Sequence, residues 1–128
     1  MKVLVDTHAL LWLFDGDSRL SERARSIFLD PGNQLFFSIA SLWELCVKLS
    51  LEKLVLDRGW FDTLTSEMLA NQVSWLAIEA PHCRAVESLD FHHRDPFDRM
   101  LIAQAMVENM SVMTRDPHFR QYPVDCVW

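Results

Sequence analysis

Short apolar segments with strand character alternate along this chain with segments that carry helix signals. Residues 2–5 form an apolar, β-branched run that is typical of a strand buried on both faces. Further strands are predicted at residues 35–38, 73–78, 111–114 and 124–127. Helices are predicted at residues 7–14, 22–29, 42–51, 60–71 and 81–89 and from residue 96 onward, and a loop at 115–123. This alternation predicts an α/β fold in which a parallel sheet is covered by helices on both faces.

The sequence RDPFDRMLIAQA at residues 94–105 contains a well-marked helix start. Asp95 suits the N-cap, Pro96 suits the first helical position, and Asp98 falls in the first turn, where the helix dipole favours an anion. The apolar residues three, four and seven positions after Asp98 are Leu101, Ile102 and Ala105. The Asp98 carboxylate therefore shares the core-facing stripe of its own helix. One explanation for Asp98 at this position is that it is a second capping acid. The positions of three other acids favour a functional role instead.

The composition restricts the classes of protein to consider. A chain of 128 residues, half of them apolar and five of them Trp, is long enough for one globular domain with a hydrophobic core. The net charge of −6 argues against a broad basic surface for nucleic acid, although a local basic patch and bound cations leave nucleic acid open as a substrate. Three widely spaced cysteines without a CxxC pair fit a reducing cytoplasm. The apolar run at residues 9–14 is too short for a signal peptide or membrane span.

Four acids are predicted to meet at one edge of the sheet. Asp6 directly follows the first strand, and Asp116 directly follows the strand at 111–114. Glu44 lies within two turns of the second strand, and Asp98 begins the helix that leads into the fourth. In an open parallel sheet, ligands bind beyond the carboxyl ends of the strands. The topology therefore places all four carboxylates on the same rim.

Each acid also has an ordinary structural explanation. Asp6 can cap its helix, and Asp116 before Pro117 can be a turn acid. Glu44 precedes Lys48 by four residues, the favourable order for an ion pair on a helix surface. Gathered together, however, the acids would destabilise the fold, because two carboxylates about 4 Å apart repel by roughly 4 kcal/mol at an effective dielectric constant near 20.

A divalent cation among the acids would remove this repulsion. Oxygen ligands without His or Cys at ligand spacing favour Mg²⁺ or Mn²⁺ over zinc. Such a site is suited to water activation and phosphodiester hydrolysis, with the metal stabilising charge on the scissile phosphate.

Four motifs together resemble PIN-domain ribonucleases, and specifically the VapC-type toxins of toxin–antitoxin pairs. They are VLVDT at residues 3–7, SIASLWE at 38–44 with Lys48, DPFDRMLIA at 95–103 and TRD at 114–116. The resemblance spans essentially the whole chain and implies one PIN domain over residues 1–128. It implies a three-layer α/β/α sandwich around a short, mainly parallel sheet of four to five strands. It also implies a metal-dependent endoribonuclease for single-stranded RNA that forms homodimers and is inhibited by a small antitoxin protein.

The acidic quartet implied by this resemblance is Asp6, Glu44, Asp98 and Asp116. We expect the three aspartates to hold Mg²⁺, or Mn²⁺, and Glu44 to orient or deprotonate the attacking water. Supporting or substrate contacts are expected from Thr7, Ser38, Lys48, Asp95, Arg99, Thr114 and Arg115. Capping is an equally good role for Ser38. Arg99 stands where the family commonly has alanine, and we interpret it as a tolerated variant that alters substrate contacts.

Other features allow further interpretations. His92 and His93 lie in a polar loop and are interpreted as surface histidines. The segment at residues 43–61 has more apolar residues than one buried stripe needs, which suggests a groove for a partner helix or a dimer face.

Two alternative functions remain open. A haloacid-dehalogenase-like phosphatase also begins with an aspartate after its first strand, but it needs a second aspartate two residues later, where this chain has His8. A receiver-like, non-catalytic binding module would also gather acids at a strand edge, but Glu79 after the third predicted strand does not serve as its phosphoacceptor. With three glycines the chain has no phosphate-cradling loop, which excludes nucleotide binding by a P-loop or dinucleotide fingerprint.

Overall fold

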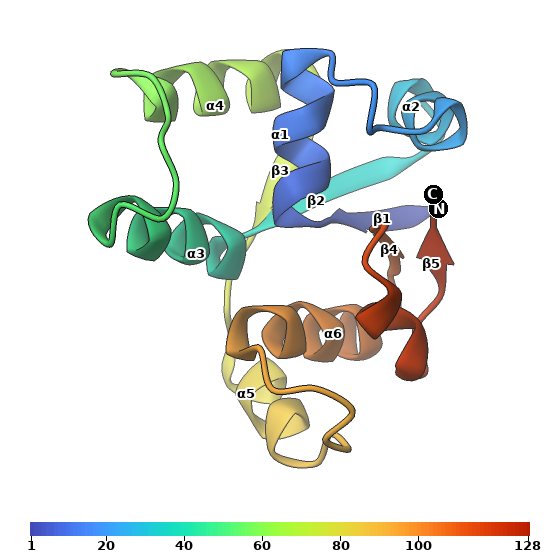
Figure 1. Ribbon diagram of the computed structural model, residues 1–128. Helices are drawn as coiled ribbons and strands as arrows, with labels where there is room; N and C mark the ends of the chain where they lie inside the picture. The colour runs from blue at the N-terminus through green and yellow to red at the C-terminus, as the bar shows by residue number, and fades with distance from the viewer.

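The computed structural model describes residues 1–128 and centres on a five-stranded sheet (Figure 1). The strands are β1 (Lys2–Val5), β2 (Gln34–Ser38), β3 (Val73–Leu76), β4 (Ser111–Met113) and β5 (Cys126–Val127). They lie in the order β3-β2-β1-β4-β5, and every neighbouring pair is parallel. Val5 pairs with Phe37 and with Met113, so β1, β2 and β4 end near the same level. Their carboxyl ends therefore form one edge of the sheet.

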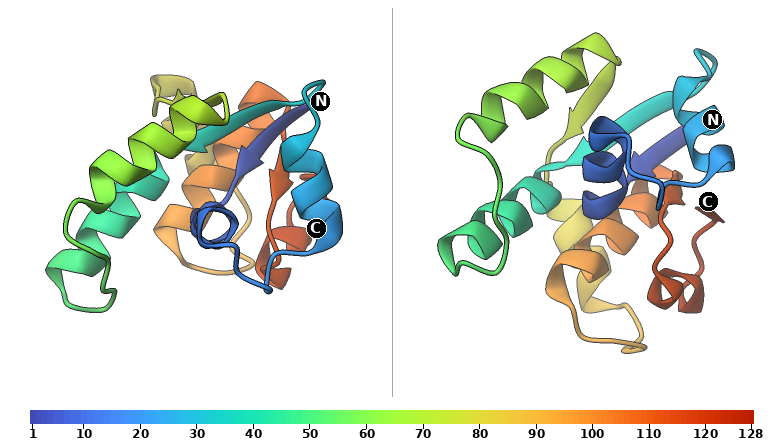
Figure 2. Two further views of the ribbon diagram at one scale, coloured as in Figure 1. Left: turned by 90° about the horizontal axis from the view of Figure 1, so that it is seen from above. Right: turned by 45° about the horizontal axis from the view of Figure 1, so that its top comes forward.

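Helices cover both faces of this sheet (Figures 1 and 2). They are α1 (Thr7–Asp15), α2 (Glu22–Leu29), α3 (Ile39–Ser50), α4 (Trp60–Ala70), α5 (Ala80–Glu87), α6 (Pro96–Glu108) and the 3₁₀ helix η1 (Pro117–Gln121). In Figure 1, α1, α2 and α4 lie above the sheet and α5 and α6 lie below it, while α3 leaves the end of β2 and contacts both α1 and α6. The predicted three-layer α/β/α sandwich is confirmed. None of the helices combines the length and hydrophobicity needed to cross a bilayer.

The central strand β1 supplies both hydrophobic cores. Val3 and Val5 pack in the core with α1, α2 and α4, whereas Leu4 packs in the core with α5 and α6. All three side chains are completely buried. Because side chains alternate between the faces of a strand, a strand covered on both faces needs an unbroken apolar run. This is why residues 3–5 of β1 are all apolar.

The third predicted helix begins three residues earlier than expected, at Ile39 instead of residue 42. Ser38 is the N-cap, and its hydroxyl accepts a hydrogen bond from the backbone N–H of Ala40 at 3.0 Å. The capping role considered for Ser38 from the sequence therefore starts the helix earlier than expected. The third and fifth strands are shorter than predicted, ending at Leu76 and beginning at Cys126.

The segment at residues 115–123, predicted as a loop, contains the helix η1. The Asp116 side chain caps this helix by accepting a hydrogen bond from the backbone N–H of His118, and Pro117 occupies its first position. Phe119 in η1 is buried in the core that also contains the apolar side chains of α6. Burial of that ring stabilises a short helical turn that local sequence preferences alone do not predict.

Candidate functional site

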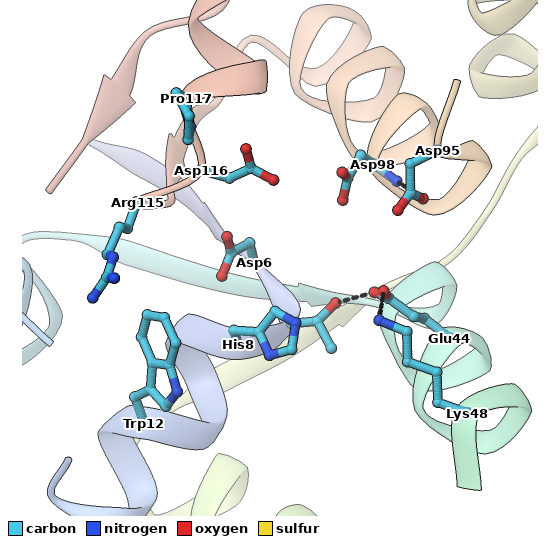
Figure 3. A pocket seen from close by; sticks show the side chains of 11 residues that line it. Asp6, His8, Trp12, Glu44, Lys48, Asp95, Asp98, Arg115, Asp116 and Pro117 are labelled. Carbon is cyan, nitrogen blue, oxygen red and sulfur yellow. Dashed lines mark hydrogen bonds and ion pairs between the residues drawn. The ribbon is translucent and has the colours of Figure 1, made fainter. Parts of the chain in front are cut away.

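A cleft of about 240 Å³ at the carboxyl edge of the sheet contains the predicted acidic quartet (Figure 3). Asp6 precedes α1, Glu44 lies in α3, Asp98 lies in the first turn of α6, and Asp116 precedes η1. Asp95, the N-cap of α6, lines the same cleft. Figure 3 shows the carboxylates of Asp6, Asp98 and Asp116 extending into one space from three separate elements. The structure thus brings together acids that are up to 110 positions apart in the sequence.

Asp6 and Asp116 also perform the local roles considered from the sequence. Asp6 Oδ1 accepts a hydrogen bond from the Ala9 N–H at 2.7 Å, which caps α1. Asp116 Oδ1 accepts from the backbone N–H of His118 at 2.9 Å and contacts the His118 ring nitrogen Nδ1 at 2.8 Å. Each cap engages one oxygen of its carboxylate, so capping and a role in the cleft are compatible.

Glu44 is held firmly on the opposite side of the cleft. The Thr7 hydroxyl donates to its Oε1 at 2.8 Å, and Lys48 Nζ lies 2.8 Å from its Oε2. The ion pair with Lys48 therefore forms as predicted, but Glu44 is buried, with 4% of its surface exposed, and is not on an open helix face. Two fixed partners give this carboxylate one orientation and compensate its charge.

Asp98 and Asp6 lie in an environment that disfavours their ionised forms. Desolvation by burial is the main reason that the pKa of Asp98 is raised to about 8. The negative charges that raise it further are those of Asp95, Asp116, Glu44 and Asp6. Burial also raises the pKa of Asp6, although the Thr114 hydroxyl acts in the opposite direction. The cleft therefore contains negative charge that the protein's own cations do not fully neutralise.

The donor chemistry of the cleft fits a hard divalent cation. Its acids provide only oxygen ligands, which Mg²⁺ and Mn²⁺ prefer, and a cation would offset both the burial and the neighbouring negative charges that raise the pKa of Asp98. As they stand, no three acidic, histidine or cysteine side chains converge closely enough to hold an ion. Direct coordination of one ion by three of these carboxylates therefore requires them to draw together.

Two histidines contact acids of the cleft. His93 Nε2 lies 3.3 Å from Asp98 Oδ2, and His93 Nδ1 lies 2.8 Å from the Tyr122 hydroxyl. The His93 ring stacks on that of His118, with 5.0 Å between centroids, and His118 contacts Asp116. The interpretation of His93 as a surface histidine is wrong, because only 10% of its side chain is exposed. Nothing in the local sequence distinguishes it from His92, since its position depends on η1 packing against its loop.

The hydroxyl residues near the acids have mainly structural positions. Ser38 is fully buried, caps α3, donates to Gln104 Oε1 at 2.6 Å and does not line the cleft. The Thr114 hydroxyl accepts a hydrogen bond from the Asp116 N–H at 3.1 Å and so helps to position that acid. Thr7 lines the cleft and holds Glu44.

The basic residues divide between the cleft and the interior. Lys48 and Arg115 line the cleft, and Arg115 is exposed and forms no ion pair. Arg99 is 4% exposed and does not line it. The Arg99 guanidinium donates to the carbonyls of Leu89 and Asp90 at 3.2 and 2.8 Å. Arg99 therefore holds the segment at Leu89 and Asp90 from the protein interior and does not reach the cleft.

Residues 3–125 match the PIN domain family. The chain belongs to this family. No curated protein sequence matches it, but solved structures share its fold. VapBC2 from Rickettsia felis, bound to a promoter DNA fragment, superposes with a TM-score of 0.75 at 14% identity, over 99% of this chain and 98% of that one. VapBC-1 from nontypeable Haemophilus influenzae gives 0.70 at 16% identity, over 99% and 97%. FitAcB from Neisseria gonorrhoeae gives 0.63 at 17% identity, over 98% and 96%.

The stability of the metal-free PIN domain is expected to fall as pH rises through the range in which Asp98 ionises. Because the pKa of Asp98 is about 8 in the folded state and that of an ordinary aspartate is 3.8, the folded state binds more protons than the unfolded state between these values. Stability is then lost with increasing pH. Thermal unfolding in EDTA from about pH 5 to about pH 9 measures the effect, which Asp98→Asn should reduce. An unfolding temperature that falls equally steeply with pH in the wild type and in Asp98→Asn would contradict this explanation.

Proposed function

We propose that this PIN domain is a metal-dependent endoribonuclease that cleaves single-stranded RNA and acts as the toxin of a toxin–antitoxin pair. The observation that carries the proposal is the cleft in which Asp6, Asp98 and Asp116 extend into one space beside the fixed carboxylate of Glu44. Membership of the PIN domain family supports nuclease activity at this cleft. The raised pKa of Asp98 supports a cation requirement, because the ionised site carries excess negative charge.

Asp6, Asp98 and Asp116 would hold Mg²⁺ or Mn²⁺, which supplies positive charge beside the scissile phosphate and lowers the pKa of water. Glu44 would orient the attacking water or accept its proton. Each carboxylate oxygen of Glu44 already accepts one hydrogen bond and can accept a second. Thr7 and Lys48 hold the Glu44 carboxylate so that no side-chain rotation is needed during the reaction.

Arg115 is the best candidate for a phosphate contact on this acidic protein. Its guanidinium is exposed at the cleft and has no carboxylate partner, whereas Lys48 is paired with Glu44. A phosphodiester approaching a chain of net charge −6 needs such a local cation.

A protein partner, proposed here as an antitoxin or a second copy of the chain, is supported by an exposed apolar surface, and the antitoxin also by the structural neighbours. A groove of about 340 Å³ between α3, α5 and α6 is lined mostly by apolar side chains, among them Trp43, Phe91 and Phe97. Trp43 is 59% exposed and Phe91 78% exposed, which is costly in water. VapBC2, VapBC-1 and a toxin–antitoxin complex from Klebsiella pneumoniae share the fold, the last with a TM-score of 0.63 at 19% identity.

The proposal is tested by incubating the purified protein with a mixed pool of single-stranded RNA. We expect cleavage with Mg²⁺ or Mn²⁺ and none with EDTA, because the carboxylates alone cannot stabilise charge on the phosphate. Production of the protein in a bacterial host without a partner should arrest growth if it is a toxin. A folded, partner-free sample that cuts no RNA under any metal condition would contradict the nuclease assignment and return attention to the phosphatase and binding-module alternatives.

A further inference from the structure

One side of the cleft differs from the rest of its lining because it contains a tryptophan side chain. Trp12 is the only large apolar side chain there, among acids, hydroxyls and cations. It lies on α1 one turn beyond His8, and Figure 3 shows it near Arg115 and away from Glu44 and Lys48, with His8 between. Trp12 is partly buried, packs against the core on this face of the sheet and makes an edge-on contact with Trp128, which also packs against that core. The indole is therefore anchored in the fold and still reaches the surface of the cleft.

Planar and cationic groups surround the Trp12 ring. The imidazole of His8 stacks with it at 5.9 Å and an interplanar angle of 27°. The guanidinium of Arg19 lies over the ring at 4.7 Å from the centroid, and that of Arg115 lies at 5.5 Å. Asp17 fixes Arg19 by contacts of 3.1 and 2.7 Å. These contacts already occupy much of the ring, so a base would stack on it by displacing the exposed imidazole of His8.

The charges of these neighbours favour RNA as the occupant. A protein partner's apolar helix seated on Trp12 would bury the guanidinium of Arg115, which has no carboxylate partner, at a cost that its contacts would not repay. A nucleotide instead offers a flat base for the indole and a phosphate for the exposed arginine. Aromatic side chains beside a cationic groove are the common means of binding single strands, because every base has a face to stack.

We propose that Trp12, with Arg115 beside it, forms a subsite that stacks one unpaired base of single-stranded RNA next to the phosphodiester being cleaved. The inference rests on the proposed function and adds to it the group that holds the strand. It also explains a restriction to single strands, since a base stacked on Trp12 cannot be paired and stacked within a helix. The preference is for an unpaired base of any identity, because stacking alone reads no hydrogen-bonding edge.

The test combines substitutions with RNA substrates in which one nucleotide at a time lacks its base. With a short RNA that the wild type cuts at one site, removal of one base close to that site should raise KM about tenfold with a smaller change in kcat. Trp12→Leu should raise KM by a similar factor on the intact RNA and cause no further rise at that abasic position. Trp12→Phe should recover part of the loss, and Trp75→Leu, at a tryptophan that does not line the cleft, should cause none.

Several outcomes would overturn the subsite. The proposal is wrong if no single abasic position raises KM, or if Trp12→Leu leaves KM for intact RNA unchanged. It is also wrong if, at every abasic position, Trp12→Leu raises KM by the same factor as on intact RNA. Unchanged cleavage by folded Trp12→Leu would indicate that Trp12 serves packing or a protein partner. If thermal unfolding shows that Trp12→Leu is not folded, the abasic series on the wild type and on Arg115→Ala decides the question, because Arg115 is exposed and its truncation should leave the fold intact. A wild type that cuts no RNA would instead refute the proposed function itself.

Discussion

Asp98→Asn is expected to abolish RNA cleavage without weakening the fold. The amide keeps the size of the carboxylate but loses the negative charge that a divalent cation requires. A loss of about 4 kcal/mol of transition-state stabilisation, or roughly 10³-fold in rate, is expected. In EDTA the variant should be as stable as the wild type or more stable, because the protein already raises the pKa of Asp98 to about 8 and so favours an uncharged group there. Cleavage rates with Mg²⁺ and unfolding temperatures in EDTA measure the two effects.

Asp62→Asn is a matched control for this substitution. Asp62 occupies the first turn of α4 as Asp98 occupies the first turn of α6, but it is exposed and does not line the cleft. Its substitution should leave cleavage unchanged and cost only the small favourable interaction of an acid with the helix dipole. Metal-dependent cleavage that survives Asp98→Asn would remove Asp98 from the mechanism.

Arg99→Met is expected to lower the free energy of unfolding by about 3 kcal/mol. The buried guanidinium satisfies the carbonyls of Leu89 and Asp90, donates to the Tyr122 hydroxyl at 3.1 Å and lies 4.0 Å from the Phe91 ring centroid. Methionine fills part of the volume but leaves those acceptors without a donor. Equilibrium denaturation in urea measures the loss.

A control variant and a measurement of KM distinguish a structural role of Arg99 from a role in substrate binding. Arg23→Met, at an exposed arginine of α2 that forms no ion pair, should change stability by less than about 0.5 kcal/mol. With the fold intact at low temperature, Arg99→Met should retain the wild-type KM for RNA. A raised KM with unchanged stability would instead place Arg99 at the substrate and contradict the interior position.

The alternation of apolar runs and capped helices was sufficient to predict the layers of the fold. A strand buried on both faces must be apolar throughout, and Val3, Leu4 and Val5 satisfy this requirement in three consecutive positions. Caps such as Asp6 and Asp95 are local signals, because the capping side chain bonds to the backbone two or three residues away. The meeting of the four acids followed from the same reasoning, since all parallel strands end at one edge.

The sequence could not predict which polar residues near the acids face the cleft. His93 and Arg99 lie on either side of Asp98, yet His93 contacts the Asp98 carboxylate and Arg99 reaches inward to loop carbonyls. Tyr122, which bonds to both, comes from the far side of η1. That arrangement depends on contacts between segments more than 20 residues apart, which local pattern does not encode.

The sequence by itself therefore determined the parallel α/β architecture, most of the helix starts and the edge at which the acids gather, because each depends on short-range periodicity and capping. Only the tertiary structure decided the pKa of Asp98, the hydrogen bond from Thr7 to Glu44 and the position of Trp12 beside Arg115 in the cleft. Burial and charge proximity act through space, and a side chain's ionisation or availability to a ligand depends on neighbours that only packing of the complete chain brings within reach.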